Sequence, residues 1–349
     1  MPITNLLTSR IRPVLLEKQK RFGDVFFEYA DKATSDLIKI SVGFISVDSI
    51  IFLRENIRNK SINAIELTIG MHGFSGFTKP QFSIVTALDA ELRKNNAGSV
   101  NICTAFPFHG KVYSFWKNGK PIIGIIGSSN LDSILSDGHL DYEVDLLFDD
   151  TQTLKKTALL QKELSEKAST PLQGWIPKNF KSNPLFSADQ PNIKTLTPSE
   201  IAEYWNIQKG KSFLLKLKTE PKSNLNAFFA KGRENTKTKI IRPRPWYEAA
   251  VIVGNEVTKQ KGYPRYYEFE IVTSDGYKFW CTTSGSNSKN FQSKSDLRIL
   301  GMWIKGKMEE AGVLQVGEPV TKEVLDRFGK QNIKLTATND PKLWLAELI

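Results

Sequence analysis

Four polar side chains in the middle of the chain have the types and the spacing needed to cleave a phosphodiester bond. His109 and Lys111 stand two residues apart, and Ser128 and Asn130 follow in the run Gly-Ser-Ser-Asn. Phosphoryl transfer requires a nucleophile, together with cations or hydrogen-bond donors that hold the non-bridging phosphate oxygens. The imidazole could attack phosphorus while the ammonium, hydroxyl and amide groups hold its oxygens. Only an acid for the leaving oxygen is not evident in this segment.

Three predicted strands must position these side chains. Apolar runs predict strands over residues 99–106, 111–116 and 120–126, and Asn118-Gly119 between the last two strands is a strong β-hairpin signal. Residues two apart on a strand point to the same face. The imidazole and the ammonium should therefore point together if their strand begins just before them. A hairpin places the start of its first strand beside the end of its second, so the four side chains can converge.

These residues resemble the signature of the phospholipase D superfamily, which is H-x-K, then an Asp, then G-S-x-N. His109, Lys111, Ser128 and Asn130 match the signature. Trp116 stands where the usual Asp would fall, and that Asp is a variable element among the nucleases of the family. The interval between the two motifs is longer than usual, and the predicted hairpin accommodates the extra residues.

A further acid, Glu143, fits the family residue that orients the catalytic imidazole. It lies in a predicted strand over residues 141–148. A carboxylate that accepts the Nδ1–H of a histidine fixes its tautomer and stabilises the imidazolium. The resemblance therefore implies that Glu143 sets the imidazole of His109.

The same strand leaves a metal-dependent alternative open. Asp141, Glu143 and Asp145 share one face of the strand, and three carboxylates could bind Mg²⁺ in a two-metal nuclease. We expect these acids to form the exposed face of a half-buried strand. The side chains predicted to point inward are those of Tyr142, Val144, Leu146 and Phe148. We prefer the histidine mechanism, because a Mg²⁺ site has no need of an H-x-K motif.

The number of histidines predicts an assembly of two chains. The chain has three, His72, His109 and His139, and only one of them lies in an H-x-K motif. The mechanism implied by the resemblance uses two such histidines: one forms a phosphohistidine, and the other protonates the leaving oxygen. The simplest solution is a homodimer in which His109 of each subunit faces the other across a two-fold axis. His72 lies in the glycine-rich run 70–76, a predicted mobile loop from which it could contact the substrate, although we expect an ordinary loop histidine.

Charge and composition indicate a polyanionic partner. Residues 1–200 carry 23 Lys and Arg against 21 Asp and Glu, whereas residues 201–349 carry 25 against 16, a net charge of +9 out of the total of +11. A basic domain joined to a phosphodiesterase-like domain points to nucleic acid. A phospholipid substrate would need an apolar entry surface, of which the sequence gives no sign.

The remaining features of the sequence predict a cytoplasmic protein. No apolar run approaches the roughly 20 residues of a membrane span, and residues 1–10 lack the basic and apolar regions of a secretory signal. Cys103 and Cys281 are far apart and do not form a C-x-x-C motif. They therefore suit reduced cytosolic thiols better than a disulfide or a zinc site.

The periodicity of the chain predicts two domains. Residues 1–167 alternate strands with helices, the latter over 47–57, 81–94 and 153–167, which predicts an α/β layer structure with one mixed sheet. Residues 168–197 are rich in Pro, Ser and Asn and are predicted to be a linker. Residues 198–349 show several strands with about one helix, which favours an open β-barrel.

Two polar segments interrupt the strands of the second domain, over residues 224–247 and 282–294. They concentrate Arg, Asn, Gln, Ser and Lys, the side chains that contact base edges and phosphates. Two such segments on one barrel could clamp a duplex. The side chains that we expect at the DNA are Lys231, Arg233, Asn235, Lys237, Arg242, Arg244, Asn287, Lys289 and Asn290.

Over its whole length the chain resembles the metal-independent restriction endonucleases of the phospholipase D type. In that family an α/β nuclease domain, with a mixed sheet flanked by helices, dimerises and is followed by a mainly β, open-barrel domain similar to the plant B3 domain. By this resemblance the two polar segments are the arms with which a B3 fold grips the major groove. It implies sequence-specific, type II-like cleavage of double-stranded DNA with no metal or other cofactor.

Some members of the family act with a separate ATP-hydrolysing translocase subunit. This chain has no G-x-x-x-x-G-K-[ST] loop, so any ATP hydrolysis would need such a partner. Two other functions stay open from sequence. One is a DNA-binding regulator with a disabled nuclease domain, supported only by the missing motif Asp. The other is a phosphodiesterase acting on lipid or nucleotide, against which the basic second domain argues.

Overall fold

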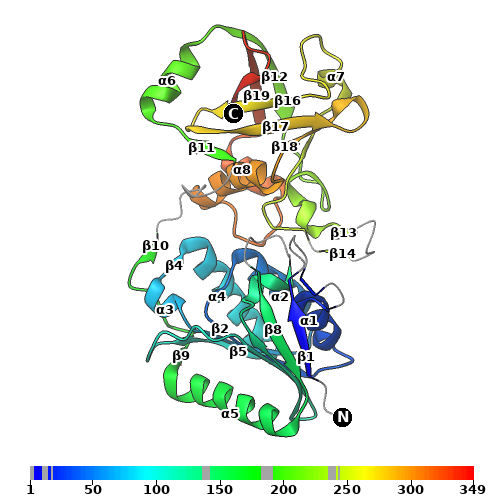
Figure 1. The fold of residues 1–349 in the computed structure, drawn as a ribbon. Coiled ribbons are helices and arrows are strands. Elements are labelled where there is room, and N and C mark those ends of the chain that lie inside the picture. Colours follow the sequence, from blue (N-terminus) through cyan, green and yellow to red (C-terminus); the bar gives the residue numbers. More distant parts are fainter. Residues whose placement is uncertain are drawn as a thin grey trace. The chain divides into compact units, whose positions relative to one another are not determined.

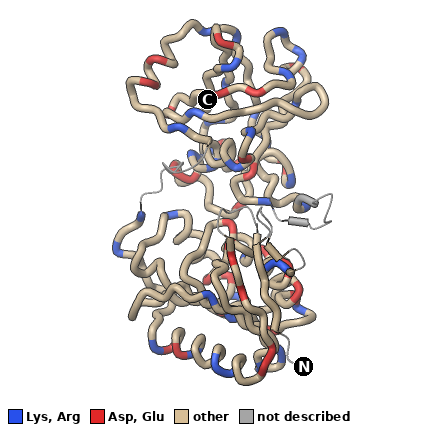
Figure 2. The backbone as a smooth tube through the Cα atoms, viewed as in Figure 1, with Lys and Arg blue, Asp and Glu red and all other residues tan. Residues whose placement is uncertain are grey.

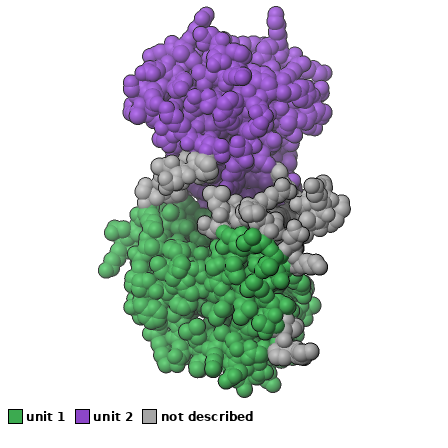
Figure 3. Space-filling model, viewed as in Figure 1, with its two compact units in different colours: residues 1–182 green, residues 183–349 purple. Residues whose placement is uncertain are grey.

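A computed structural model divides the chain into two compact units, residues 1–182 and 183–349 (Figure 3). It describes residues 4–9, 15–16, 19–135, 142–181, 192–234, 241–242 and 244–349, with the backbone alone at 233–234 and 241–242.

Unit 1 is built on one mixed sheet, as predicted. Within the described residues this sheet has eight strands. β2, β3 and β5 run parallel, whereas β1, β8, β7 and β6 form an antiparallel half. In sheet order the strands are β1 (Thr4–Thr8), β8 (Val144–Phe148), β7 (Lys120–Gly127), β6 (Val112–Lys117), β2 (Leu37–Val42), β3 (Ile65–Ile69), β5 (Gly98–Cys103) and β9 (Ser169–Pro171).

Helices cover both faces of this sheet. Figure 1 shows α5 on one face and α2 and α4 on the other. The three helices predicted from periodicity begin and end within two residues of their expected ranges. Ser46 caps α2 by accepting the Ser49 N–H at 3.2 Å. The helical elements of the unit are α1 (Phe22–Ala30), α2 (Val47–Arg58), α3 (His72–Ser75), α4 (Lys79–Lys94), α5 (Thr151–Ala168) and the 3₁₀ turn η1 (Leu131–Ile134).

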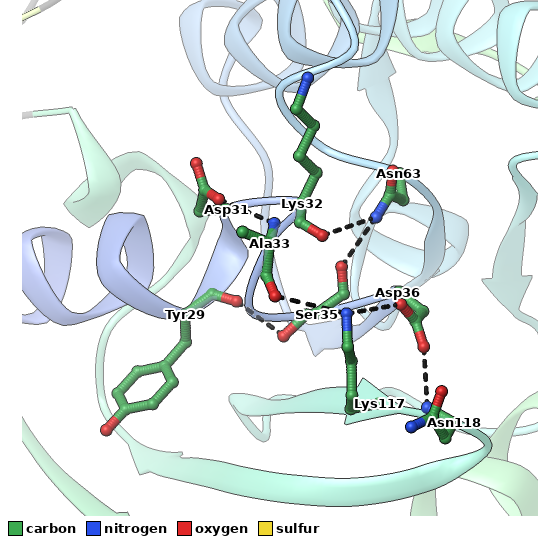
Figure 4. A network of polar contacts seen from close by, with 9 residues as sticks. All are labelled: Tyr29, Asp31, Lys32, Ala33, Ser35, Asp36, Asn63, Lys117 and Asn118. Carbon is green, nitrogen blue, oxygen red and sulfur yellow. Dashed lines mark hydrogen bonds and ion pairs between the residues drawn. The ribbon is translucent and has the colours of Figure 1, made fainter.

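The predicted hairpin joins β6 to β7. Asn118 and Gly119 both have positive φ, 50° and 71°, as a tight two-residue hairpin turn requires. A network of polar contacts fixes the hairpin to the turn between α1 and β2 (Figure 4). In it the Asp36 carboxylate accepts from Lys117 Nζ at 3.0 Å and from the Asn118 N–H at 2.7 Å. The hairpin is thus a fixed part of the sheet.

The predicted linker contributes strands to both units. Its first residues end α5 and form β9, and β10 (Phe180–Lys181) pairs with β4 (Phe77–Thr78) of unit 1. β11 (Ile193–Thr195) pairs with β17 of unit 2. The described parts of residues 168–197 are therefore integrated into the two units.

Unit 2 is mainly β, and its sheet is an open barrel, as predicted. β12 and β15 end the sheet and lie near each other without pairing in the described residues. In sheet order the strands are β12 (Lys209–Lys216), β19 (Asn332–Thr338), β20 (Leu343–Leu348), β16 (Glu268–Thr273), β17 (Tyr277–Ser284), β18 (Asn290–Ser293) and β15 (Val251–Ile252).

Short helices and one separate strand pair complete unit 2. The longest helix of the described residues of unit 2 is α8 (Arg298–Glu310), and β13 (Arg233–Glu234) pairs with β14 (Ile241–Arg242). The helical elements are α6 (Pro198–Asn206), α7 (Asn255–Thr258), α8 (Arg298–Glu310), α9 (Lys322–Phe328) and the 3₁₀ turns η2 (Asn224–Phe229) and η3 (Ser286–Ser288). No helix in the described ranges is long and apolar enough to cross a lipid bilayer.

Candidate active site

The hairpin brings the two halves of the motif together at one end of β6 and β7. Val112 pairs with Ile126, and the Gly127 N–H donates to Lys111 O at 3.2 Å. The start of β6 therefore lies beside the end of β7, as the sequence predicts. β6 begins only at Val112, so His109 and Lys111 precede the strand. They still converge, because Lys111 Nζ lies 3.2 Å from His109 Nδ1 and 3.1 Å from Nε2.

The two basic side chains differ in exposure. His109 is exposed, whereas Lys111 is only 6% exposed and donates from Nζ to His109 O at 2.8 Å. Burial lowers the pKa of Lys111, and the negative charge of Glu143 opposes that shift. The arrangement presents an accessible imidazole beside a cation that the protein holds in place.

Ser128 and Asn130 lie at the end of β7 with the other groups. The Ser128 hydroxyl is exposed and accepts the Val144 N–H at 2.9 Å. Asn130 is half-buried, and its Oδ1 accepts the Phe44 N–H at 3.2 Å. That bond directs the amide so that its Nδ2 group can donate to a ligand. Both side chains can therefore contribute donors to a phosphate held beside His109.

Glu143 lies near Lys111 but is not bonded to His109. Its backbone is fixed by Ser9, whose hydroxyl accepts the Glu143 N–H at 3.0 Å and whose own N–H donates to Glu143 O at 3.1 Å. Within the described residues no hydrogen bond joins its carboxylate to the imidazole. A role for Glu143 in setting His109 stays a prediction.

The predicted orientation of β8 is wrong. Asp145 is 2% exposed, whereas Val144 and Leu146 are 42% and 39% exposed. The acid points inward because Ser129 satisfies its carboxylate, and Val144 and Leu146 point outward, whereas Phe148 is buried as predicted. In the part of the chain that the structure describes, no three His, Cys, Asp or Glu side chains are grouped to hold a metal ion. Asp141, the third acid of the metal alternative, lies outside the described residues.

His72 is not the mobile-loop histidine that the sequence led us to expect. It begins the short helix α3, is 4% exposed and stacks on Phe77 with ring centroids 4.5 Å apart. Nδ1 donates to Gly76 O at 3.0 Å, and Nε2 accepts the Ile45 N–H at 3.2 Å. Burial lowers the pKa of His72. His139 lies outside the described residues.

Trp116, which replaces the usual motif Asp, lies at the hairpin end of β6. Its Nε1 donates to Ser114 Oγ at 2.8 Å, and Lys39 Nζ lies 4.8 Å from its ring centroid. Five residues of strand, roughly 16 Å, separate it from Lys111. The replacement therefore lies away from the four converging side chains.

The expected DNA contacts are only partly described. Arg244 donates from Nε to Lys231 O at 3.2 Å and forms an ion pair with Glu248. Arg233 and Arg242 are paired through their backbones in β13 and β14, but their side chains lie outside the description. Asn235 and Lys237 also lie outside the described residues.

The second polar segment interrupts the strands only at its centre. It contains the tight turn η3 followed by β18, which pairs with β17. Asn287 and Lys289 are exposed at this turn, and Asn287 Nδ2 donates to Asn255 Oδ1 of α7 at 3.3 Å. Asn290 is half-buried at the start of β18.

The β13–β14 pair of the first polar segment does not lie beside the turn η3 of the second. Figure 1 shows the β13–β14 pair well apart from α7, beside which η3 lies. Lys and Arg are spread over many elements of unit 2 rather than gathered in one stripe (Figure 2). The expected contacts therefore form two separate groups, one around Lys231 and Arg244 and one around Asn287 and Lys289.

Family models match both units. The NgoFVII restriction endonuclease N-terminal PLD domain matches residues 22–172, and the NgoFVII C-terminal B3-like DNA-binding domain matches residues 204–339. No curated protein matches the sequence significantly.

Solved structures similar to the chain include NucT from Helicobacter pylori, with 16% identity, a TM-score of 0.33, and coverage of 48% of this chain and 98% of that one. A phospholipase D family member, Nuc from Salmonella typhimurium, has 14% identity, a TM-score of 0.33, and coverage of 49% and 98%. With both domain models matched in order along the sequence, the chain belongs to the NgoFVII type of restriction endonucleases, with an N-terminal PLD domain and a C-terminal B3-like DNA-binding domain.

Proposed function

We propose that the protein is a sequence-specific restriction endonuclease that hydrolyses DNA through a phosphohistidine formed on His109. The observation that carries the proposal is the convergence of His109 and Lys111 with the end of β7, in a chain that also has a B3-like DNA-binding domain. Exposure of the imidazole, with Lys111 fixed beside it, suits nucleophilic attack on a bound phosphodiester.

In the proposed reaction a ring nitrogen of His109 bonds to phosphorus as the bond from phosphorus to one sugar oxygen breaks. His109 of the partner subunit donates a proton to that oxygen. Lys111, Ser128 and Asn130 hold the charged equatorial oxygens, and Glu143 orients the imidazole of His109. Water then attacks phosphorus and gives a proton to His109 of the partner subunit, while the bond from phosphorus to the ring nitrogen breaks; this releases the phosphate end and restores both imidazoles. No step uses a metal ion.

An exposed apolar surface beside the site supports a shared active site. We call it the β1–β8–β7 face, and it consists of Leu6, Ile126, Val144 and Leu146, each 36–42% exposed. Leu146 pairs with Leu6 on one side and with Ile126 on the other, so the side chains are adjacent on neighbouring strands. Val144 donates its N–H to Ser128 Oγ, so the face reaches the site. Contiguous exposed apolar side chains are typical of an interface.

Unit 2 is proposed to select the DNA sequence. Lys231 and Arg244 at one place, and Asn287, Lys289 and Asn290 at another, carry groups that can contact phosphates and base edges. Four further side chains are proposed as DNA contacts on the basis of the sequence alone: Arg233, Asn235, Lys237 and Arg242. A separate ATP-hydrolysing subunit stays a prediction from the family resemblance. The regulator alternative gains no support from Trp116, which lies away from the site.

The test is incubation of the full chain with mixed-sequence plasmid DNA in excess EDTA, followed by mapping of the fragment ends. We expect discrete fragments with ends at a fixed distance from one sequence. His109→Ala should abolish cleavage and leave the Kd for a specific duplex unchanged. Rapid quenching followed by mass spectrometry should find DNA phosphate attached to His109. Cleavage that strictly requires Mg²⁺, or that persists in His109→Ala, would contradict the proposal.

A further inference from the structure

Ser129 lies between Ser128 and Asn130, the two proposed phosphate-binding residues, and is hydrogen-bonded to a buried acid. Asp145 is 2% exposed, and its two oxygens accept the Ser129 hydroxyl at 2.6 Å and the Ser129 N–H at 3.0 Å. On its other side the buried Tyr113 hydroxyl donates to Ser129 O at 2.8 Å. Ser129 is therefore fixed at its amide, its carbonyl and its side chain.

The backbone of Gly127, two residues before Ser129, lies directly against the Asp145 carboxylate. Gly127 pairs with Asp145 across β7 and β8. A Cβ atom at Gly127 would lie only 2.2 Å from Asp145 Oδ1 and 2.5 Å from Val144 O. Only glycine allows this close approach. The Gly of the Gly-Ser-Ser-Asn run is thus explained by the position of Asp145.

Successive side chains of an extended segment point to opposite sides. Ser129 points inward to Asp145, whereas its neighbours Ser128 and Asn130 are exposed and half-buried. Fixing Ser129 therefore fixes the direction of both neighbours. A misplacement of about 1 Å in such a group can cost on the order of 10²-fold in rate.

We propose that Asp145 is a positioning residue for the phosphate-binding turn, defined as Gly127–Asn130, an inference that rests on the proposed nuclease function. Asp145 does not contact the substrate. It holds Ser129, so that Ser128 and Asn130 are oriented before DNA binds. Burial raises the pKa of Asp145 while the bonds from Ser129 lower it, so Ser129 favours the charged form that accepts both bonds.

The experiment compares Asp145→Asn and Asp145→Val with the wild-type chain on specific duplex DNA and on an activated diaryl phosphodiester. Asn keeps one acceptor for Ser129 and Val keeps none. We expect kcat to fall about 10-fold in the first variant and about 100-fold in the second, with KM changed less than threefold. Ser129→Ala should lower kcat, and combining it with Asp145→Asn should add little, because one contact is removed in both.

Asp89→Asn is the matched control. Asp89 is also a buried acid, 4% exposed, which accepts the Val100 N–H at 2.7 Å and pairs with Arg93, but it supports α4 and β5. Assayed at temperatures at which each variant is fully folded, Asp89→Asn should keep the wild-type kcat. If Asp145→Asn is folded and cleaves at the wild-type rate, or if both Asn variants lose activity equally, the inference is wrong.

If the Asp145 variants do not fold, the inference is tested with Ser129→Ala and Tyr113→Phe. Ser129→Ala removes the bond to Asp145, and Tyr113→Phe removes the bond to Ser129 O. Wild-type rates in both would contradict the inference. A wild-type chain that cleaves neither substrate would instead count against the proposed nuclease function, and the two failures are thereby distinguished.

Discussion

At the scale of single residues, His72 links two loops that support the site. Its Nε2 accepts the Ile45 N–H. Phe44, which precedes Ile45, donates its N–H to Asn130 Oδ1 and packs edge-on against His109, with the ring centroids 5.8 Å apart. Both ring nitrogens of His72 are occupied, so it contributes no proton to the reaction. It orients one side of the site, as Asp145 does for the other.

We expect His72→Phe to change the acid stability of the protein. Burial lowers the pKa of His72 in the folded chain below the usual 6.5, so the unfolded chain binds its proton first on acidification. The stability that this difference provides is present above pH 6.5 and is lost as pH falls. His72→Phe should lower Tm at pH 7.5, by leaving the Ile45 N–H without an acceptor, and should reduce the loss of Tm between pH 7.5 and 5.5. His109→Ala should keep the wild-type loss, because it leaves the buried His72 and its two hydrogen bonds in place.

The catalytic candidates could be predicted from sequence, but their supports could not. His109, Lys111, Ser128 and Asn130 are found by residue type and spacing. Ser129 is the variable position of the G-S-x-N motif, and its bond to Asp145 could not be predicted because it depends on the register between β7 and β8. A buried polar residue is recognised only once the partner that satisfies it is placed beside it.

At the scale of elements, secondary structure was predicted correctly where the signal lies within one segment of the sequence. The Asn-Gly turn predicts the β6–β7 hairpin, and the apolar periodicity predicts α2, α4 and α5. The prediction for β8 was wrong because the alternation of acidic and apolar residues does not reveal which face of the strand is buried. The apolar face of β8 near the site is exposed, and the burial of Asp145 is stabilised by two hydrogen bonds. Alternation fixes the period of a strand but not its orientation.

Helix α8 offers a test of how unit 2 holds its first polar segment. The buried Lys305 donates from Nζ to Trp246 O at 2.5 Å, and one turn later Glu309 accepts from the Tyr247 hydroxyl at 2.9 Å and from Trp246 Nε1 at 3.3 Å. Burial raises the pKa of Glu309 to about 7. The folded chain therefore keeps the Glu309 proton at a pH where the unfolded chain has lost it.

The stability from Glu309 is fully present below about pH 4.5 and is lost as pH rises through about 7, by no more than about 3 kcal/mol. We expect Glu309→Gln to remove this fall from the free energy of unfolding measured in urea between pH 4.5 and 8. Glu310→Gln is the control, since Glu310 is exposed and pairs only with Lys307 in the described residues. An identical pH dependence in wild type and Glu309→Gln would contradict the assignment.

At the scale of the whole molecule, each chain supplies one H-x-K histidine and one DNA-binding domain. A dimer joined through its nuclease domains would thus have two DNA-binding domains and one active site built from both subunits. Such an enzyme would cut one strand at a time, with a rearrangement between the two cuts. The sequence predicts the pairing only from the number of histidines, because the exposed β1–β8–β7 face depends on the orientation of β8, which the pattern predicted wrongly.

Leu146→Asp tests that assembly, because Leu146 is at the centre of the β1–β8–β7 face. A charge there would be buried without a partner in the dimer, which costs several kcal/mol, but would be solvated in the monomer. We expect sedimentation equilibrium to show a folded monomer that binds specific duplex with the wild-type Kd per chain and cleaves it at least 100-fold more slowly. Leu159→Asp, at an exposed apolar position of α5, should keep both the dimer and the activity. Adding the Leu146→Asp monomer to wild-type chain should leave the wild-type cleavage rate unchanged, whereas adding His109→Ala should form inactive mixed dimers and lower that rate. A Leu146→Asp monomer that cleaves at the wild-type rate would show that one imidazole is enough.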